Sequence, residues 1–336
     1  MKLNGTITDV PGIKVGHAQN ADAVTGCTVI LCEKGAVAGV DQRGGAPGTR
    51  ETDAIRPLHL VNEIHAVMLA GGSAFGLDAA SGAMKYLEAK GIGFDTGVAK
   101  VPIVPSAVIF DLSIGRSDIR PDAEMGYQAC LNATTDPVIQ GCVGAGMGAT
   151  TGAALGSHQA TKSGIGSASI DIGGGVIVGA LMVVNPFGDV INPENGKILA
   201  GARTINKGPL KLGDGPIFAD TRSLLRSFIG KTALSFAASR NTVIGVVATN
   251  ASLDREGANF LAQMAQDGLA LTIRPSHTLF DGDTMFAVST GNAKVNVNII
   301  GTFAVEVVAK AIQNAVINAI SVAGIPALQD LSQRTV

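Results

Sequence analysis

The chain has 336 residues, of which 46% are hydrophobic and 15% are charged, and its formal net charge at pH 7 is −2. This near balance of charge provides no basic surface for nucleic acid or for an acidic membrane, which argues against partners of either kind. Glycine occurs 44 times and aromatic residues make up only 4% of the chain. Such a composition favours tight turns and closely packed layers built from Ala, Val and Ile.

The first residues, MKLNGTITDVPG, lack the apolar core of a signal peptide. No uninterrupted apolar run reaches the roughly 18 residues that a membrane-spanning helix needs. The four cysteines form no CxxC pair and lie in apolar or Ala/Gly-rich surroundings, which indicates free thiols in a reducing compartment; they are Cys27, Cys32, Cys130 and Cys142. We therefore expect a cytoplasmic protein without a metal or any other cofactor.

Short apolar segments alternate along the chain with Ala-rich segments, a pattern that predicts an α/β fold. Many of the apolar segments are hydrophobic at every position, as is typical of strands covered on both faces. The predicted strands span residues 27–32, 36–40, 66–70, 107–112, 176–184, 243–249, 269–274 and 285–290. The predicted helices span residues 74–89, 254–267 and 301–323, and the second has Asp254 as its N-cap and Gly268 at its end.

Residues 193–240 differ from their surroundings because they hold eight of the 25 lysine and arginine residues and several turn signals. We interpret them as a surface excursion with one helix at about 219–229. The segment ends at Asn241 and Thr242, directly before an apolar strand. It is compatible with an ordinary long loop or with a processing site.

Thr242 has two interpretations. A threonine at the start of a strand satisfies β propensity and needs no further role. It is also a candidate for a hydroxyl that attacks the preceding carbonyl, so that the chain cuts itself before Thr242. The freed α-amine, with an unperturbed pKa near 8, would then accept the proton of that hydroxyl at neutral pH without a histidine.

Three other segments carry candidate chemistry. Asp281 and Asp283 flank Gly282, which predicts a tight hairpin turn or two carboxylates near a nucleophile. Asn185 ends an apolar strand before Pro186, where its amide marks a turn or donates to an oxyanion. Gly71 and Gly72 stand between a strand and a helix, which suggests a cluster of backbone N–H groups able to bind an anion or carbonyl.

The five histidines share no metal-ligand spacing, and no GxSxG motif is present. A serine–histidine triad is therefore not expected, which favours a nucleophile that supplies its own base.

Several strings of the sequence together resemble one peptidase family, which includes L-aminopeptidase/D-esterase, β-peptidyl aminopeptidases and the endo-type nylon-oligomer hydrolase. The strings include DVPGIKVGHA, RGGAPGTRETD, LAGGSAFGLDAA, VVNPFGDV and NTVIGVVATNA, and the resemblance runs from about residue 5 to residue 325.

The resemblance implies a four-layer αββα sandwich in one domain, made as a precursor and cut into residues 1–241 and 242–336, then assembled into a tetramer of processed heterodimers. It places the cut between Asn241 and Thr242, the nucleophile at Thr242 and the oxyanion amide at Asn185. It places the acid pair at Asp281 and Asp283, and the wall of the substrate site at Gly71, Gly72, Ser73 and Phe110.

This sequence departs from the family pattern at three positions. Ala153 stands where the nylon-oligomer hydrolase and many relatives have a lysine, so the basic role is assigned to Lys162. Phe110 replaces a tyrosine and has no hydroxyl to donate. Val108 stands where an acidic residue is thought to hold the substrate's amine in the classical aminopeptidase. That last change favours an amidase that tolerates internal bonds over a strict aminopeptidase.

The expected activity is hydrolysis of amide bonds in short peptides or ω-amino-acid oligomers through an acyl-enzyme. Two alternatives remain from the sequence. One is transfer of the acyl group to an amine acceptor on the same fold, and the other is a ligand-binding relative without turnover.

Overall fold

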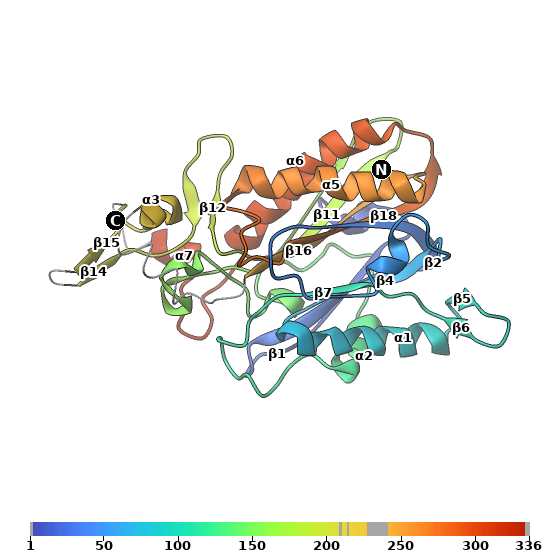
Figure 1. Cartoon of the computed structure of the whole chain (residues 1–336), viewed down its shortest axis with the longest axis horizontal. Coiled ribbons are helices and arrows are strands. Elements are labelled where there is room, and N and C mark those ends of the chain that lie inside the picture. Colours follow the sequence, from blue (N-terminus) through green and yellow to red (C-terminus); the bar gives the residue numbers. More distant parts are fainter. Residues whose placement is uncertain (1–2, 208–209, 214, 227–240, 333–336) are drawn as a thin grey trace.

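The main strands form one nine-stranded hydrogen-bonded sheet that folds over along β2 (Thr25–Gln42), so that its two halves lie face to face at the centre of the structure, and a pair of helices covers the outer face of each half (Figure 1). The two halves are named the first and the second sheet. The computed structural model describes residues 3–207, 210–213, 215–226 and 241–332. The helices α5 (Arg255–Thr272) and α6 (Val297–Ile317) cover one sheet, and α1 (Ala79–Ala89) and α2 (Ala123–Leu131) cover the other. The expected αββα sandwich is thus confirmed.

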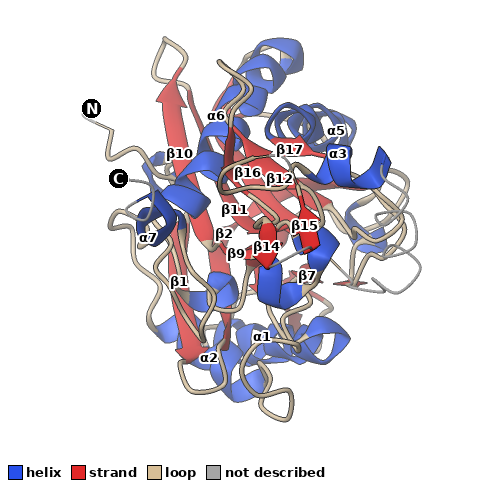
Figure 2. Ribbon diagram, turned by 90° about the vertical axis from the view of Figure 1, so that its left-hand side faces the viewer, coloured by secondary structure: helices blue, strands red, loops and turns tan. Residues whose placement is uncertain are grey.

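The second sheet, below α5 and α6, carries the residues of greatest interest. Its strands follow one another in the order β10 (Ile165–Asp171), β11 (Ile177–Asn185), β16 (Thr242–Ala251) and β18 (Thr284–Ala293). Neighbouring pairs are antiparallel except β16 and β18, which are parallel. Figure 2 shows β10, β11 and β16 side by side with α6 packed against them.

The first sheet is built around β2 (Thr25–Gln42), which pairs with β1 (Lys14–Asn20) and β4 (Ile64–Ala70). Beyond β4 lie β7 (Ser106–Val108) and β3 (Thr49–Arg50). The end of β2, residues 37–42, pairs instead with β18 of the second sheet. The sequence predicted two strands here, and the structure has one 18-residue strand with a register shift between Leu31 and Ala36.

The remaining elements are short. Further strands are β5 (Phe94–Asp95), β6 (Lys100–Val101), β8 (Thr150–Thr151), β9 (Thr161–Lys162), β12 (Asp189–Ile191), β13 (Ile198–Ala200), β14 (Ile205–Lys207), β15 (Leu210–Leu212) and β17 (Ile273–Arg274), and further helices are α3 (Thr221–Arg226) and α7 (Leu328–Ser332). Short 3-10 helices cover residues 7–9, 53–55, 73–78, 144–146, 153–155 and 157–159. The helix expected at 219–229 is described as α3, and residues 227–240 lie outside the described part.

The strand β16 shows why so many segments are apolar at every position. Ile244 and Val246 lie in the core between the two sheets, whereas Val243 and Val247 lie in the core under α5 and α6. Successive side chains of a strand point to opposite faces, so both sets are buried when both faces are covered. Each fully buried valine or isoleucine contributes about 1.5–3 kcal/mol.

The helix α5 corrects one prediction from the sequence. Gly268 was expected to end it and residues 269–274 to form a strand, but the helix continues to Thr272. A Cβ on Gly268 would lie 2.7 Å from a methyl carbon of Val308 in α6, so the glycine permits close packing of two helices. Only Ile273 and Arg274 form a strand, β17.

The helix α6 is the one described helix long and apolar enough to cross a membrane by length and composition. Its most apolar 18-residue window is 56% buried inside the protein. The buried residues pack against β10, β11 and α5. The apolar composition is accounted for by this packing. The four cysteines are buried free thiols, as expected.

Candidate active site

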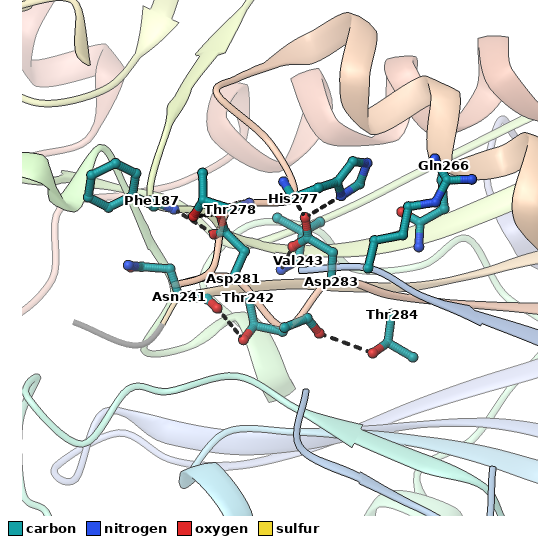
Figure 3. Close-up of polar contacts among 12 residues, drawn as sticks. Phe187, Asn241, Thr242, Val243, Gln266, His277, Thr278, Asp281, Asp283 and Thr284 are labelled. Atoms are coloured by element: carbon teal, nitrogen blue, oxygen red, sulfur yellow. Dashed lines mark hydrogen bonds and ion pairs between the residues drawn. The ribbon is translucent and has the colours of Figure 1, made fainter. Parts of the chain in front are cut away.

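The ends of three neighbouring strands of the second sheet, β11, β16 and β18, lie side by side. Thr242 is the first residue of β16, and its partner across the ladder is Asn185, the last residue of β11. The strand β18 runs parallel to β16, and the turn that precedes it carries Asp281 and Asp283. The topology therefore brings together the residues that the sequence placed in the nucleophile, oxyanion and acid roles. Figure 3 shows Thr242 beside Asp281 and Asp283.

The backbone N–H and the carbonyl oxygen of Asn241, the residue before Thr242, are both hydrogen-bonded. The N–H of Asn241 donates to the carbonyl of Phe280 at 2.9 Å, and the N–H of Gly282 donates to the carbonyl oxygen of Asn241 at 3.0 Å. The hydroxyl of Thr242 donates to the same carbonyl oxygen at 2.5 Å. An N–H donor at this distance is suited to stabilise negative charge on that oxygen during attack.

Asp283 connects the acid pair to the nucleophile through the backbone. Its Oδ1 accepts the N–H of Val243 at 2.8 Å, one residue after Thr242. Its Oδ2 accepts the backbone N–H of His277 at 3.1 Å and lies 2.7 Å from the Nδ1 of the same histidine. The carboxylate is only 2% exposed, so these contacts are shielded from water. Asp283 thereby fixes the backbone that carries the Thr242 hydroxyl.

Asp281 is held by the turn on the other side. Its Oδ1 accepts the N–H of Phe187 at 3.1 Å, and its Oδ2 accepts the N–H and the hydroxyl of Thr278 at 3.1 and 2.6 Å. Burial, together with the nearby charge of Asp283, raises the pKa of Asp281 to about 6. Asp281 therefore carries a proton in moderately acidic solution.

The side chain of Asn185 is oriented by two contacts. Its Oδ1 accepts the N–H of Thr150 at 3.0 Å, and its Nδ2 donates to the carbonyl of Phe110 at 3.3 Å. The bond to Phe110 shows that the amide nitrogen faces the side where Phe110 lies. The nitrogen has a second hydrogen besides the one that it donates to Phe110. This orientation agrees with the expected oxyanion role, which stays a prediction.

A cavity of about 410 Å³ opens beside Thr242. Its wall is formed by two loops and the end of β7, with Thr242 at its inner end. The residues that line it are Gly45, Ala46, Pro47, Gly48, Ser73, Ala74, Val108, Ile109, Phe110 and Thr242. Ser73 and Phe110 thus lie where the sequence placed a substrate site, and none of the ten residues is charged.

The glycine pair does not provide the expected cluster of N–H donors. The N–H of Gly71 donates to the carbonyl of Gly26 at 2.9 Å, and that of Gly72 to Oδ1 of Asp111 at 2.7 Å. The N–H of Ser73 donates to the carbonyl of Ile109 at 3.0 Å. Internal acceptors occupy all three donors in this structure, so the expected cluster of free N–H groups at Gly71 and Gly72 is not formed, and neither glycine lines the cavity. Contact of the two glycines with a substrate stays a prediction. They shape the loop that presents Ser73.

Lys162 is fully buried and its ammonium is satisfied within the protein. It donates to the carbonyls of Ser163, Ala149 and Gly146 at 2.7, 2.8 and 3.3 Å. Burial lowers the pKa of Lys162. The lysine therefore binds the segment before Thr150, whose N–H orients Asn185. Its assigned role in catalysis stays a prediction. In this structure Lys162 contacts that segment, through which it would act on the site.

Sequence reasoning missed two contributors to the site, His277 and Gly282. The histidines were compared only with metal-ligand spacing and with serine–histidine triads, so a histidine bound to an aspartate six residues later was overlooked. The string HTLFDGD contains both, and the tight turn that it predicts is what folds the ring back onto Asp283. The role of the Gly282 N–H depends on a pairing of Asn241 with Asp281 across the sheet edge, which no local pattern indicates.

Comparison with known proteins identifies the family. The model of peptidase family S58 matches residues 5–328. The chain belongs to this family. An uncharacterised aminopeptidase of Mycobacterium tuberculosis is 42% identical over 351 residues and covers 97% of each chain. A 6-aminohexanoate-oligomer endohydrolase of Kocuria sp. is 32% identical over 320 residues, which cover 91% of this chain and 84% of the relative.

Solved structures agree on the fold. The L-aminopeptidase D-Ala-esterase/amidase of Ochrobactrum anthropi, described as a variant of the Ntn hydrolase fold, superposes with a TM-score of 0.71 at 19% identity. A Burkholderia sp. β-aminopeptidase superposes with a TM-score of 0.67 at 23% identity, and each match covers 98% of this chain and 94% of the neighbour. Family and relatives together make this S58 member a hydrolase of amide bonds.

Proposed function

We propose that this S58 peptidase cuts its own chain before Thr242 and then uses Thr242 as an N-terminal nucleophile against amide bonds. The observation that carries the proposal is the position of the Thr242 hydroxyl, 2.5 Å from the carbonyl oxygen of Asn241. A second donor, the N–H of Gly282, is already bound to that oxygen at 3.0 Å. The hydroxyl and the peptide bond that it would cut thus lie next to each other in the uncut chain, which supports the proposal.

The proposed self-cleavage proceeds through an ester. The Thr242 oxygen forms a bond to the carbonyl carbon of Asn241, and the Gly282 N–H stabilises the resulting oxyanion. The bond to the Thr242 nitrogen then breaks, the hydroxyl proton passes to that nitrogen, and an ester joins Asn241 to the Thr242 oxygen. Water hydrolyses the ester, which leaves a carboxylate on Asn241 and a free amine and hydroxyl on Thr242.

Substrate hydrolysis repeats the chemistry with an external amide. The α-amine of Thr242 accepts the hydroxyl proton, the oxygen attacks the substrate carbonyl, and the leaving amine takes the proton as the acyl-enzyme forms. The Asn185 amide stabilises the oxyanion. Asp283 holds the Val243 N–H and keeps the nucleophile in place. Water then attacks the ester and releases the acid.

The substrates that we propose are short peptides or ω-amino-acid oligomers. Relatives named as an aminopeptidase and as a 6-aminohexanoate-oligomer endohydrolase support this range. We also propose a cytoplasmic tetramer of processed heterodimers, with one domain formed by residues 1–241 and 242–336 together. Light scattering of the purified protein gives the assembly mass that tests this part.

Intact mass and denaturing electrophoresis test the self-cleavage. We expect fragments of residues 1–241 and 242–336 from the wild type, a single uncut chain from Thr242→Ala, and slow or complete cutting in Thr242→Ser, which keeps a hydroxyl. Incubation of the purified protein with a peptide amide tests the hydrolysis. A wild-type chain that stays whole and still hydrolyses the amide would refute this mechanism.

A further inference from the structure

The amide of Asn185 is held by a backbone carbonyl that lies next to a buried carboxylate. Its Nδ2 donates to the carbonyl of Phe110, and the residue after Phe110 is Asp111, which is 2% exposed. We propose that Asp111 is a positioning residue, which fixes the Phe110 carbonyl where it orients the Asn185 amide for the oxyanion. This inference rests on the proposed function, because it assumes that Asn185 stabilises the oxyanion of the substrate.

The Asp111 side chain connects two segments that are far from it in the chain. Its Oδ2 accepts the hydroxyl of Thr25 at 2.7 Å, and its Oδ1 accepts the N–H of Gly72 at 2.7 Å. Thr25 is the first residue of β2, and Gly72 precedes Ser73 of the cavity wall. Both bonds are buried, so a rotation of the carboxylate would leave a buried donor without an acceptor. The side chain therefore keeps its own backbone, and the adjoining Phe110 carbonyl, in place.

The backbone of two glycines encloses the carboxylate. A Cβ on Gly71 would lie 2.1 Å from Oδ2 of Asp111, and a Cβ on Gly148 would lie 2.5 Å from the Cβ of Asp111. No side chain fits at such distances, so glycine at both positions is what leaves room for Asp111. This packing accounts for one glycine in each of the strings LAGGSAFG and GAGMGA.

The second contact of Asn185 lies beside a buried charge of opposite sign. Its Oδ1 accepts the N–H of Thr150, and the carbonyl of the preceding residue, Ala149, binds the ammonium of Lys162. Burial raises the pKa of Asp111 and lowers the pKa of Lys162, while the charge of each group opposes the shift of the other. The two buried charges therefore stabilise each other, and each lies beside one of the two contacts that hold Asn185.

The two proposed reactions should depend on Asp111 to different degrees. In the proposed self-cleavage the N–H of Gly282 binds the oxyanion, whereas in the hydrolysis of a substrate Asn185 binds it. A displaced Asn185 amide should therefore slow hydrolysis and spare self-cleavage. A general loss of folding would instead slow both reactions.

The first test measures both rates in variants of Asp111. With alanine p-nitroanilide or 6-aminohexanoyl p-nitroanilide and fully cut protein, we expect Asp111→Ala to lower kcat by about tenfold or more, with KM and the separate rate of self-cleavage within about twofold of wild type. Asp111→Asn keeps the shape of the side chain and an acceptor oxygen, so it should recover most of the loss. Asp9→Asn is the control, because Asp9 also binds backbone N–H groups, those of residues 4–6, but joins them to Ser169 on β10; its kcat should match the wild type.

A double-mutant cycle then tests whether Asp111 acts through Asn185. Asn185→Ala alone should lower kcat by about a hundredfold, as for the loss of one oxyanion donor. In that background Asp111→Ala should lower kcat by less than about twofold further. Thr25→Val keeps the side-chain shape and removes one donor to Asp111. It should lower kcat roughly threefold, and it replaces Asp111→Ala in the cycle if that variant does not fold.

Crystal structures of wild type and Asp111→Asn give the orientation of the Asn185 amide without any substrate, and those of Thr25→Val extend the series. A lower kcat with normal self-cleavage, no further loss in the Asn185→Ala background and a displaced amide support the inference. Wild-type kcat in Asp111→Ala, a change in KM alone, an equal loss of self-cleavage, or an Asn185 amide that stays in place in every variant overturns it and leaves the proposed function standing. A wild-type chain that stays uncut and hydrolyses neither p-nitroanilide overturns the proposed function, and this inference with it.

Discussion

Replacement of His277 tests whether the acid pair acts through the backbone of the nucleophile. The imidazole lies 2.7 Å from Oδ2 of Asp283, and that carboxylate in turn holds the N–H of Val243. His277→Phe keeps a flat ring and removes the contact. His277→Asn keeps an N–H donor and suits the backbone, because His277 has a φ of 56° and asparagine tolerates that region.

The size of the effect follows from burial and from the contacts that remain. The side chains of His277 and Asp283 are 18% and 2% exposed, so solvent screens their interaction little. A hydrogen bond to a charged group is worth about 1.5–3 kcal/mol. The backbone N–H of His277 still binds the same oxygen in both variants, so we expect the lower part of that range. A loss of about 1.5–2 kcal/mol corresponds to a roughly 10- to 30-fold slower reaction.

The assay is the rate at which freshly produced chain is converted into the two fragments, followed by electrophoresis at several pH values. We expect His277→Phe to slow conversion by the factor above, with partial recovery in His277→Asn. His59→Asn is the control, since His59 is an exposed histidine whose ring contacts the carbonyl of Pro57 and whose backbone carbonyl, which the variant keeps, accepts from Arg255. Equal rates and equal pH profiles for wild type and both His277 variants would show that the ring does not position Asp283.

Three further outcomes are expected. Gly282→Ala brings a Cβ to 2.2 Å from the backbone oxygen of Ala46, so the turn must shift and fragment formation should slow by about tenfold or more, whereas Gly257→Ala, which meets only a side-chain atom at 3.0 Å, should process normally. Lys162→Met removes the ammonium that donates to three buried carbonyls, each of which keeps one other donor, and should lower the free energy of unfolding in urea by about 1–3 kcal/mol; an unchanged value would refute a structural role. Burial lowers the pKa of His17 to about 4, so the unfolded chain binds a proton that the folded chain refuses as pH falls from about 6.5 to about 4. The wild type should therefore lose stability relative to His17→Asn as pH falls from about 7.5 to about 5, which urea unfolding of both proteins at each pH measures.

The layers of the fold were predictable from local pattern because a strand buried on both faces leaves an uninterrupted apolar run. Residues 243–249 and 285–290 are such runs, and they became β16 and β18. The end of α5 was not predictable, because a glycine after a helical pattern usually indicates the end of the helix. In the folded protein Gly268 lies inside α5 and allows the helix to pack closely against α6. Residues 227–240, the end of the segment 193–240 that is rich in lysine and arginine, lie outside the described part.

The candidate site was likewise predictable from the sequence only in part. Side chains whose chemistry is intrinsic, such as Thr242 and the two aspartates, were identified from residue type and resemblance. Backbone groups were not, because whether an N–H is free depends on where the chain folds. The N–H groups of Gly71 and Gly72 donate to acceptors within the protein, while that of Gly282 donates to the carbonyl of Asn241, where we propose the cut. A sequence pattern for N–H donors therefore needs the fold before it predicts a binding site.

The order of strands in the second sheet determines how the two fragments would behave after the cut. Both β16 and β18 belong to the segment after Thr242, and they lie between β11 and β2, which belong to the segment before it. Separating the fragments would break the sheet on both sides and expose the cores beneath α5 and α6. The cut protein should consequently melt in one transition, and neither fragment should persist as a folded monomer when purified alone from denaturant. The nick would alter the covalent chain while leaving a single cooperative unit.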